Sequence, residues 1–553
     1  MVQITRICKS FSGLAAIAAL SAATPASAIL ADSGNIEAYA EAWVADLSDE
    51  DAKAASKYYA LLRENPSDPA IADGLWESSI RAGERSKAIR AARTLELQGG
   101  ANEATLLLFG DALQKKDWKS AEASLAALAD GNNYSFVLPL FKSWVNVAQG
   151  KAHAFPSEPE NSLLRFYSAD QTAYLNLAAG DISKAKSSLS DFLNLETSYS
   201  LDLRLRAAPI LAAAGEGDFA GRLVDGIIPT DVAQNLTAKR QSNGLSKLRP
   251  EEGVAALYTR LASALIEQEA PEKGLAMARI AQWLAPKNDA AKIVLARALD
   301  IDGAKGGAHL VRAAIGGKSP YWARASIAEI QRLSADGQHA EAISLAQRIL
   351  AQRNSADFAA LLGQTQEAAG QLEAARATFA RLVKSGETAR IGAGRLSEYY
   401  LQLATVTKKQ GNWRAARALL EKGQALNPQN AYISNYLGYS LLERGEELNK
   451  ALEMLRRAHR LAPESMAITD SLGWGYYLTG NFKNAIYYLE KAAKGSGNDL
   501  TINEHLGDAY WQYGRRVEAR YAWRVASLLA EGADAARLSE KISLGLSGAS
   551  RQN

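Results

Sequence analysis

Apolar residues recur with a period of about 34 residues over the last quarter of the chain, from Leu396 to Leu529. Each period opens on a leucine followed by a small residue, and these pairs are Leu403-Ala404, Leu437-Gly438, Leu472-Gly473 and Leu506-Gly507. An alanine and then a large apolar residue follow in each period, and they are Ala416 with Leu420, Ala451 with Leu455, Ala485 with Leu489, and Ala519 with Trp523. One residue is inserted between Glu443 and Asn449. The pattern predicts four consecutive copies of one structural unit.

Within each period the apolar residues follow helical spacing. Leu472 and Tyr476, four residues apart, lie on one face of a predicted helix. Gly480 then marks a turn, because glycine readily ends a helix in a left-handed conformation. Pro428 and Pro463 each close a unit, since proline cannot continue a helix. The small residues of the pattern let paired helices approach closely, so each unit is predicted to be a helix-turn-helix.

This pattern resembles the tetratricopeptide repeat, which has the same period. The resemblance implies an all-α fold, a right-handed α-solenoid of stacked helix-turn-helix repeats. The run YLGYSLLERGEELNKALEMLRRAHRLAPESMAITDSLGWGYYLTGNFKNAIYYLEKA is also similar to the C-terminal block of exported bacterial repeat proteins. These include lipoprotein adaptors of carboxyl-terminal processing proteases, and such a protease is therefore a possible partner.

The first 28 residues have the features of a secretory signal peptide. Arg6 and Lys9 precede a short apolar run, and Ala26-Ser27-Ala28 offers a small-x-small cleavage pattern. The only cysteine, Cys8, precedes that run, so the lipid-bearing cysteine of a lipoprotein is missing from the cleavage site. We expect export to the periplasm, and a peripheral attachment to the envelope stays open.

The remaining chain is predicted to divide into five helical or connecting segments and a tail. The polar interval 229–253 is the best candidate for a break between two halves. Expected in order are divergent helical repeats (29–228), that linker or irregular segment (229–253), tetratricopeptide-like repeats (254–395), the regular block (396–530), a capping helix (531–544) and a disordered tail (545–553).

Charge and motifs offer little support for catalysis or for nucleic-acid binding. The formal net charge of +3 falls to +1 when the two basic residues of the leader are removed, which leaves no basic field for phosphates. Gly316-Gly317-Lys318-Ser319 is the nearest sequence to a phosphate loop, but Arg312 stands where that motif needs its first glycine. The five histidines are scattered singly, unlike a helical zinc site. We therefore expect no enzyme activity, no metal and no cofactor.

A concave groove lined by the first helix of each unit is the expected binding surface. In tetratricopeptide proteins the groove positions lie two before, two after and five after the opening leucine. The polar and aromatic residues at these positions are Asn435, Tyr439, Asp470, Trp474, Tyr477, Glu504, Asp508 and Trp511, and Tyr432 adds a further ring. Together they form an aromatic stripe beside carboxylates and amides. Such a stripe suits a peptide or a helix, which it would hold by ring contacts, apolar burial and backbone hydrogen bonds.

The sequence therefore favours a non-catalytic scaffold or adaptor that binds partner proteins or peptides. Two roles stay open, which are delivery of substrates to a periplasmic protease and assembly of envelope or polysaccharide export machinery. An enzyme on a helical scaffold is a third hypothesis. The irregular N-terminal half is an alternative location for the partner.

Overall fold

The structure is a computed structural model of the 553-residue chain. It describes residues 33–48, 50–99, 102–129, 134–152, 161–195, 197–228, 230–238, 247–389 and 391–546. The signal peptide predicted at 1–28 and most of the predicted tail lie outside the described residues. Over the described ranges every regular element is a helix, so the all-α prediction is confirmed. No helix within those ranges is both long and apolar enough to cross a membrane.

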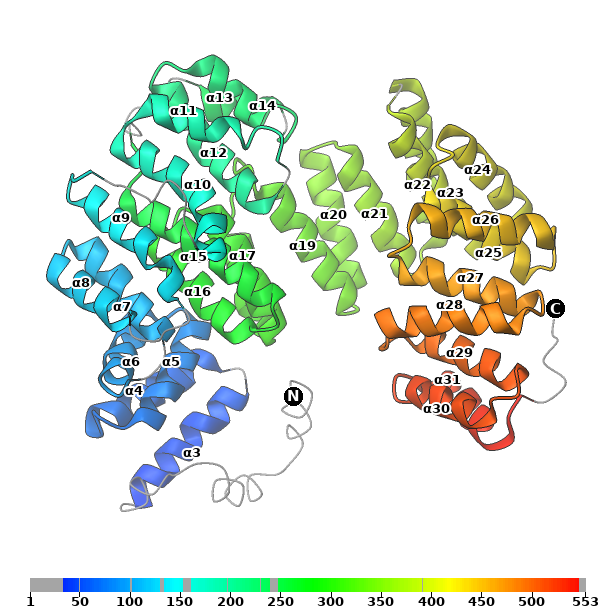
Figure 1. The fold of residues 1–553 in the computed structure, drawn as a ribbon, viewed down its shortest axis with the longest axis horizontal. Coiled ribbons are helices and arrows are strands. Elements are labelled where there is room, and N and C mark those ends of the chain that lie inside the picture. Colours follow the sequence, from blue (N-terminus) through cyan, green and yellow to red (C-terminus); the bar gives the residue numbers. More distant parts are fainter. Residues whose placement is uncertain are drawn as a thin grey trace. The chain divides into compact units, whose positions relative to one another are not determined.

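The chain forms two compact units, Met1–Glu329 and Ile330–Asn553 (Figure 1). The boundary falls within helix α19, Trp322–Ala335. The helices of the first unit up to residue 237 are α3 (Ser33–Leu47), α4 (Asp51–Glu64), α5 (Pro69–Ala82), α6 (Arg85–Leu97), α7 (Asn102–Lys115), α8 (Trp118–Ala127), η3 (Ser135–Val137), α9 (Leu138–Ala148), α10 (Ser162–Ala179), α11 (Ile182–Ser190), α12 (Ser198–Ala213), α13 (Gly217–Val224) and α14 (Thr230–Thr237).

The divergent helical repeats predicted for 29–228 form helix pairs, and a glycine followed five residues later by an alanine recurs in them. Gly83 and Gly180 end α5 and α10 in the left-handed conformation, with φ angles of 79° and 80°. Ala88 and Ala185, each five residues further on, are fully buried against the preceding helix. The glycine-then-alanine spacing therefore marks real helix pairs in this divergent part of the chain.

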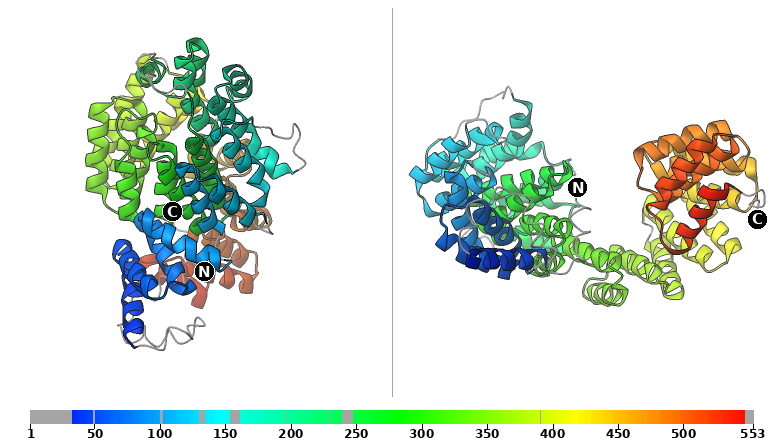
Figure 2. Two further views of the ribbon diagram at one scale, coloured as in Figure 1. Left: turned by 90° about the vertical axis from the view of Figure 1, so that its left-hand side faces the viewer. Right: turned by 90° about the horizontal axis from the view of Figure 1, so that it is seen from below.

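The next helices of the first unit lie against the earlier ones. They are α15 (Pro250–Glu267), α16 (Pro271–Leu284), α17 (Asp289–Asp302) and α18 (Lys305–Ala313). Helix α15 contacts α7, α9 and α10, and α16 contacts α5 and α7. In both views of Figure 2 these green helices lie beside the blue and cyan ones.

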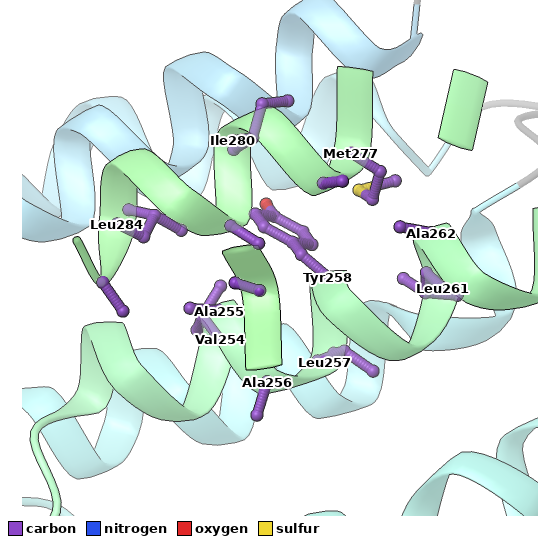
Figure 3. Close-up of a cluster of buried hydrophobic side chains, with 14 of the residues drawn as sticks. Val254, Ala255, Ala256, Leu257, Tyr258, Leu261, Ala262, Met277, Ile280 and Leu284 are labelled. Carbon is purple, nitrogen blue, oxygen red and sulfur yellow. The ribbon is translucent and has the colours of Figure 1, made fainter. Parts of the chain in front are cut away.

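Hydrogen bonds between distant parts of the sequence fix this arrangement. The Tyr258 hydroxyl donates to the carbonyl of Leu106 at 3.0 Å. Arg279 donates from Nε to the carbonyl of Ile80 at 2.7 Å and from Nη2 to that of Arg81 at 2.9 Å. Figure 3 shows the Tyr258 ring among buried aliphatic side chains of α15 and α16.

Close contact between α15 and α9 depends on a glycine. A Cβ atom at Gly253 would lie 2.0 Å from Cη2 of Trp144, whose indole is fully buried. The indole nitrogen of Trp144 donates to Oε1 of Gln171 at 2.9 Å, which holds the ring in place. Only a residue without a side chain fits at position 253.

The segment 229–253 does not separate two units, which corrects the predicted break. Helix α14 occupies part of it, and α15 begins at Pro250. Because α15 and α16 pack on α5, α7, α9 and α10, the chain on both sides of the interval belongs to one core. The division between units lies instead after Glu329.

The second unit is a stack of antiparallel helix pairs, in which each helix from α20 to α30 contacts the next one in the sequence. Its helices after α19 are α20 (His339–Gln352), α21 (Ala356–Ala368), α22 (Leu372–Ala389), α23 (Ala393–Lys409), α24 (Trp413–Leu426), α25 (Ala431–Glu443), α26 (Leu448–Leu461), α27 (Met466–Leu478), α28 (Phe482–Gly495), α29 (Leu500–Gln512), α30 (Arg516–Ser527) and α31 (Gly532–Leu544). The four predicted regular units are the pairs α23–α24, α25–α26, α27–α28 and α29–α30. The predicted capping helix is α31.

Paired helices touch at the small residues of the repeat pattern. A Cβ atom at Gly473 would lie 2.7 Å from Cγ of Leu489, and one at Gly507 would lie 2.4 Å from the Trp523 ring. The alanine of each repeat and the large apolar residue that follows it are fully buried. These residues are Ala416, Ala451, Ala485, Ala519, Leu420, Leu455, Leu489 and Trp523.

The two irregular steps in the period have structural counterparts. Leu362 and Leu403 are 41 residues apart instead of about 34, and the difference corresponds to a lengthened helix, since α22 runs for 18 residues. In the turn with the inserted residue, Glu447 has a φ of 47°, a left-handed conformation that few side chains adopt. Its carboxylate is paired with Arg417 and with Lys450. The insertion is thus absorbed at one residue of the turn.

Candidate functional site

The first helices of three consecutive pairs, α25, α27 and α29, lie side by side in the second unit. Each begins at a side-chain cap, because Asn430, Ser465 and Asp499 accept hydrogen bonds from the exposed backbone N–H groups of the first turn. These caps fix where each helix starts. The side chains at equivalent positions therefore line up across the three helices.

A pocket of about 240 Å³ opens across these helices. Helix α25 contributes Asn435, Tyr436 and Tyr439 to its lining. The remaining lining residues, from α27, α29 and the cap of α29, are Ala467, Asp470, Ser471, Asp499, Thr501, Ile502 and His505. Three of the nine predicted groove residues, Asn435, Tyr439 and Asp470, are thus brought together here.

Asn435 is the unusual polar group of this pocket. Its side-chain Oδ1 is buried and accepts no hydrogen bond from the described residues. A buried acceptor without a donor is unfavourable by about 1–3 kcal/mol, so it favours a ligand that supplies an N–H or O–H group. Tyr432, one helical turn earlier on α25, is 61% exposed and does not itself line the pocket.

Asp470, Trp474 and Tyr477 form a row with a histidine that the sequence did not single out. Nδ1 of His505 lies 3.0 Å from Oδ1 of Asp470. The imidazole stacks on the Trp474 ring at 4.0 Å between centroids, and Trp474 stacks on Tyr477 at 4.4 Å. Trp474 is therefore packed between two rings. The only sequence signal was the spacing, since His505 lies 35 residues, one repeat, after Asp470.

Burial also affects the two tyrosines of this surface. It raises the pKa of Tyr477 to about 12, with Asp508 adding to the effect. The pKa of Tyr439 is likewise raised, first by burial and then by the charge of Glu443. Both phenols therefore keep their protons at neutral pH and can donate hydrogen bonds.

The capping helix covers the groove positions of the last repeat. Arg537 and Lys541 of α31 donate to Glu504, and Lys541 also donates to Asp508 at 2.8 Å. Burial alone would raise the pKa of Glu504, but the hydrogen bonds from these two cations outweigh it and lower the pKa to about 2. Both carboxylates are thus paired within the chain. We leave them out of the binding surface.

Trp511 is likewise enclosed by neighbouring groups. The guanidinium of Arg516 lies 3.9 Å from its ring centroid, and that of Arg520 lies at 5.0 Å. A Cβ atom at Gly545, just past α31, would lie 1.9 Å from the indole. Trp511 therefore holds the end of the stack together, and the accessible part of the predicted groove lies on α25 and α27.

Metal-binding clusters of histidine, cysteine, aspartate or glutamate do not occur within the described ranges. The pocket offers one histidine, which lies beside Asp470, and Asp499, which caps α29. Its chemistry is that of hydrogen bonding and ring contact.

Comparison with known proteins supports the repeat assignment over part of the chain. No family model matches the sequence. Over 84 residues the chain is 39% identical to "TPR repeat-containing protein PA4667" of Pseudomonas aeruginosa (strain PAO1). This likeness supports a tetratricopeptide-repeat assignment. The matched stretch is 15% of this chain and 14% of the relative, so the chain spans about one seventh of that protein's length.

Two solved structures are similar to about a third of the chain. A crystal structure of MamA protein is 21% identical and has a TM-score of 0.26, covering 35% of this chain and 96% of that one. A structure from a functional characterization of Pseudomonas aeruginosa pilF is 20% identical with a TM-score of 0.29, covering 34% and 83%. Because these TM-scores are low, the all-α assignment rests on the helices themselves.

Proposed function

We propose that the second unit is a scaffold that binds an extended segment of a partner protein across α25 and α27. The observation that carries this proposal is the buried Oδ1 of Asn435, which has no donor among the described residues and lines a pocket. A peptide backbone in extended conformation presents N–H groups along its length, and one of them would satisfy this acceptor.

The neighbouring side chains suit the rest of such a segment. The exposed ring of Tyr432 and the half-buried ring of Tyr439 offer apolar contact area on the same helix as Asn435. Rigid aromatic rings give much contact area for little loss of side-chain freedom, and so they are frequent at binding hot spots. Specificity would come from the side chain of the ligand that enters the 240 Å³ pocket.

The first unit is a less suitable place for the same kind of groove. Its earlier helices are already covered by α15 and α16, whose side chains donate to backbone carbonyls of α5 and α7. The partner segment is therefore assigned to the second unit.

In the cell, we propose that the protein is exported and acts in the periplasm. The leader sequence supports export, and the resemblance to protease adaptors supports delivery of substrates to a carboxyl-terminal processing protease. Assembly of envelope or polysaccharide export machinery is the alternative role. The identity of the captured partner separates the two.

A photo-crosslinking experiment tests the surface directly. A photoreactive phenylalanine analogue replaces Tyr432 in one sample and Tyr487 in another, and both are exposed in periplasmic extract. Tyr487 is the matched control, because it is 64% exposed but lies on α28, whereas Tyr432 lies on α25, three residues before Asn435 of the pocket. We expect a partner linked at position 432 and absent at position 487, identified by mass spectrometry.

Asn435→Leu should abolish this crosslink while the protein keeps its melting temperature. A protease among the partners would support substrate delivery, and export components would support the assembly role. Equal labelling at positions 432 and 487, or undiminished crosslinking in Asn435→Leu, would exclude the proposed surface.

A further inference from the structure

A second cavity of about 380 Å³ lies within the first unit. Helices α10, α12, α15 and α17 line it, together with Tyr321 and the first turn of α19. Helix α10 brings Asp170, α15 brings Arg260, and α12 brings Asp202. The cavity thus forms where α15 and α17 meet α10 and α12, and residues more than 100 positions apart in the sequence line it.

Arg260 is the central group of this cavity. Its side chain is 6% exposed and forms an ion pair with Asp170, which is 2% exposed. Nη2 donates to the carbonyl of Phe166 at 2.9 Å, and the guanidinium lies 4.1 Å from the ring centroids of Phe166 and Tyr199. Nε, however, is buried and has no acceptor among the described residues. A buried charged donor that lacks an acceptor favours an incoming anion.

The carboxylate at the floor of the cavity is fully occupied. Asp202 accepts from the Tyr321 hydroxyl at 2.9 Å, from the Tyr174 hydroxyl at 3.1 Å and from Nε of Arg206 at 3.0 Å. Its charge is thus matched by Arg206, as that of Asp170 is matched by Arg260. Neither carboxylate is left to attract a cation.

The rim carries the uncompensated charge. Arg324 is exposed, lines the cavity, and makes no hydrogen bond or ion pair with the residues that the structure describes. Arg297 has only a loose partner, Glu267 at 3.9 Å, and both of these side chains are more than half exposed. Such an exposed ion pair contributes little to stability, so an incoming anion can replace Glu267 as the partner of Arg297. The rim is therefore positive and available.

The walls between rim and floor are apolar. Ala290, Ile293 and Val294 of α17 form one part of the lining. The ring of Phe166, 52% exposed, forms another. A large ring left half exposed beside a cavity has apolar surface to offer a ligand. The volume falls within the range of small-molecule sites.

We propose that this cavity binds a small organic acid with a flat apolar body. The anionic group lies between Arg324 and Arg297, within reach of Arg260, and the body packs on Phe166 and on Val294. This site is independent of the partner surface on α25 and α27.

Binding of matched probes to the full-length mature chain tests the proposal. The probes are 2-naphthoate and its neutral analogue 2-naphthamide, measured by isothermal titration calorimetry. We expect the acid to bind and the amide to bind at least about tenfold more weakly, because only the acid makes charge-assisted hydrogen bonds. Equal affinity for the two probes would overturn the proposal.

Variants place the binding in this cavity. Arg324→Gln should weaken 2-naphthoate binding about tenfold, and Phe166→Ala should weaken it as well. Arg93→Gln, at an exposed arginine of α6 that does not line the cavity, should leave it unchanged. Melting temperatures show that each variant is folded. Unchanged affinity in Arg324→Gln, or an equal loss in Arg93→Gln, would refute the assignment.

A carboxylate beside an aromatic ring occurs both in free metabolites and at the C-terminal end of a peptide chain. Competition experiments with 2-naphthoate distinguish these two sources. Displacement of 2-naphthoate by a short peptide with a free C-terminal phenylalanine, but not by its C-terminal amide, would identify a chain end. Displacement by free aromatic acids alone would identify a metabolite. Failure of both to compete would count against the site.

Discussion

Replacing Gly253 with alanine tests how the first unit is held together. The new Cβ would lie 2.0 Å from Cη2 and 2.1 Å from Cζ2 of Trp144. Ordinary carbon–carbon contact is about 3.5–4.0 Å, so helix α15 or the indole must move by about 1.5 Å. The indole is fully buried and hydrogen-bonded to Gln171, and neither side can move alone. We expect a loss of about 1–3 kcal/mol, toward the upper end of that range.

Scanning calorimetry of the whole chain measures this loss. At about 2 °C or less per kcal/mol for a unit of this size, the transition of the first unit should fall by about 2–6 °C. The transition of the second unit should not move, because Gly253 and Trp144 both belong to the first.

A matched glycine gives the control for helix propensity. Gly221 lies in α13, and a Cβ atom there would have nothing within 4 Å. Gly221→Ala should therefore stabilise the unit by about 0.5–1 kcal/mol. Combining Gly253→Ala with Trp144→Phe should be less damaging than the sum of the two single changes. Strict additivity, or a Gly253→Ala protein that melts like wild type, would refute the proposed contact.

Three further predictions concern the second unit. Asn435→Leu should leave stability unchanged or raise it by about 1 kcal/mol, measured by urea unfolding, because it removes a buried acceptor without a donor; a clear loss would mean that the amide is structural. Glu504 has a pKa of about 2 in the fold and 4.5 ordinarily, so its contribution is full above pH 4.5 and is lost as the pH falls toward 2. That contribution is up to about 3 kcal/mol, and acid titration of Glu504→Gln should show a correspondingly flatter loss of stability. Deleting 532–553 should expose the Trp511 ring, with a red shift of tryptophan fluorescence and self-association in ultracentrifugation, because a stack without its polar end is prone to associate; a monomeric, unshifted deletion would show that α31 is dispensable.

The helix pairs could be predicted from the sequence because they are local. Gly473 and Leu489 lie within one repeat, and their contact is repeated with the period, so the pattern itself encodes the packing. The extra residues before the regular block also follow from a count, although the count alone left open whether they form a loop or lengthen a helix. Where contacts recur with the period, the spacing of small and large residues is sufficient to predict which helices pair.

The interior of the first unit could not be predicted in this way. Arg279 bonds to Ile80 across 199 residues, and no period in the sequence relates the two. The same holds for Arg260 and Asp170, whose pairing defines the cavity. One signal was present, since Arg260 is a lone cation on the otherwise apolar face of the VAALYTRLASALI helix. A charge in such a place is seldom fully buried unless it is paired.

The groove residues predicted for the last repeat are covered by the helix that caps the stack. Glu504 and Asp508 occupy groove positions by count, yet α31 brings Arg537 and Lys541, one helical turn apart, onto both. The period fixes the positions on α29 but not the register of a helix outside the repeats. Groove residues of a terminal repeat therefore need the structure of its cap.

The docking of α15 and α16 onto much earlier helices has a kinetic consequence. Tyr258 reaches Leu106 across 152 residues, whereas His505 reaches Asp470 across only 35. Chains rich in non-local contacts form slowly, because a long loop must close before its contacts are gained. During synthesis the stretch 33–228 emerges before α15 and α16 do. The apolar surface that these two helices cover stays exposed to water until they have been made. The first unit should thus refold from denaturant more slowly than the locally organised second unit.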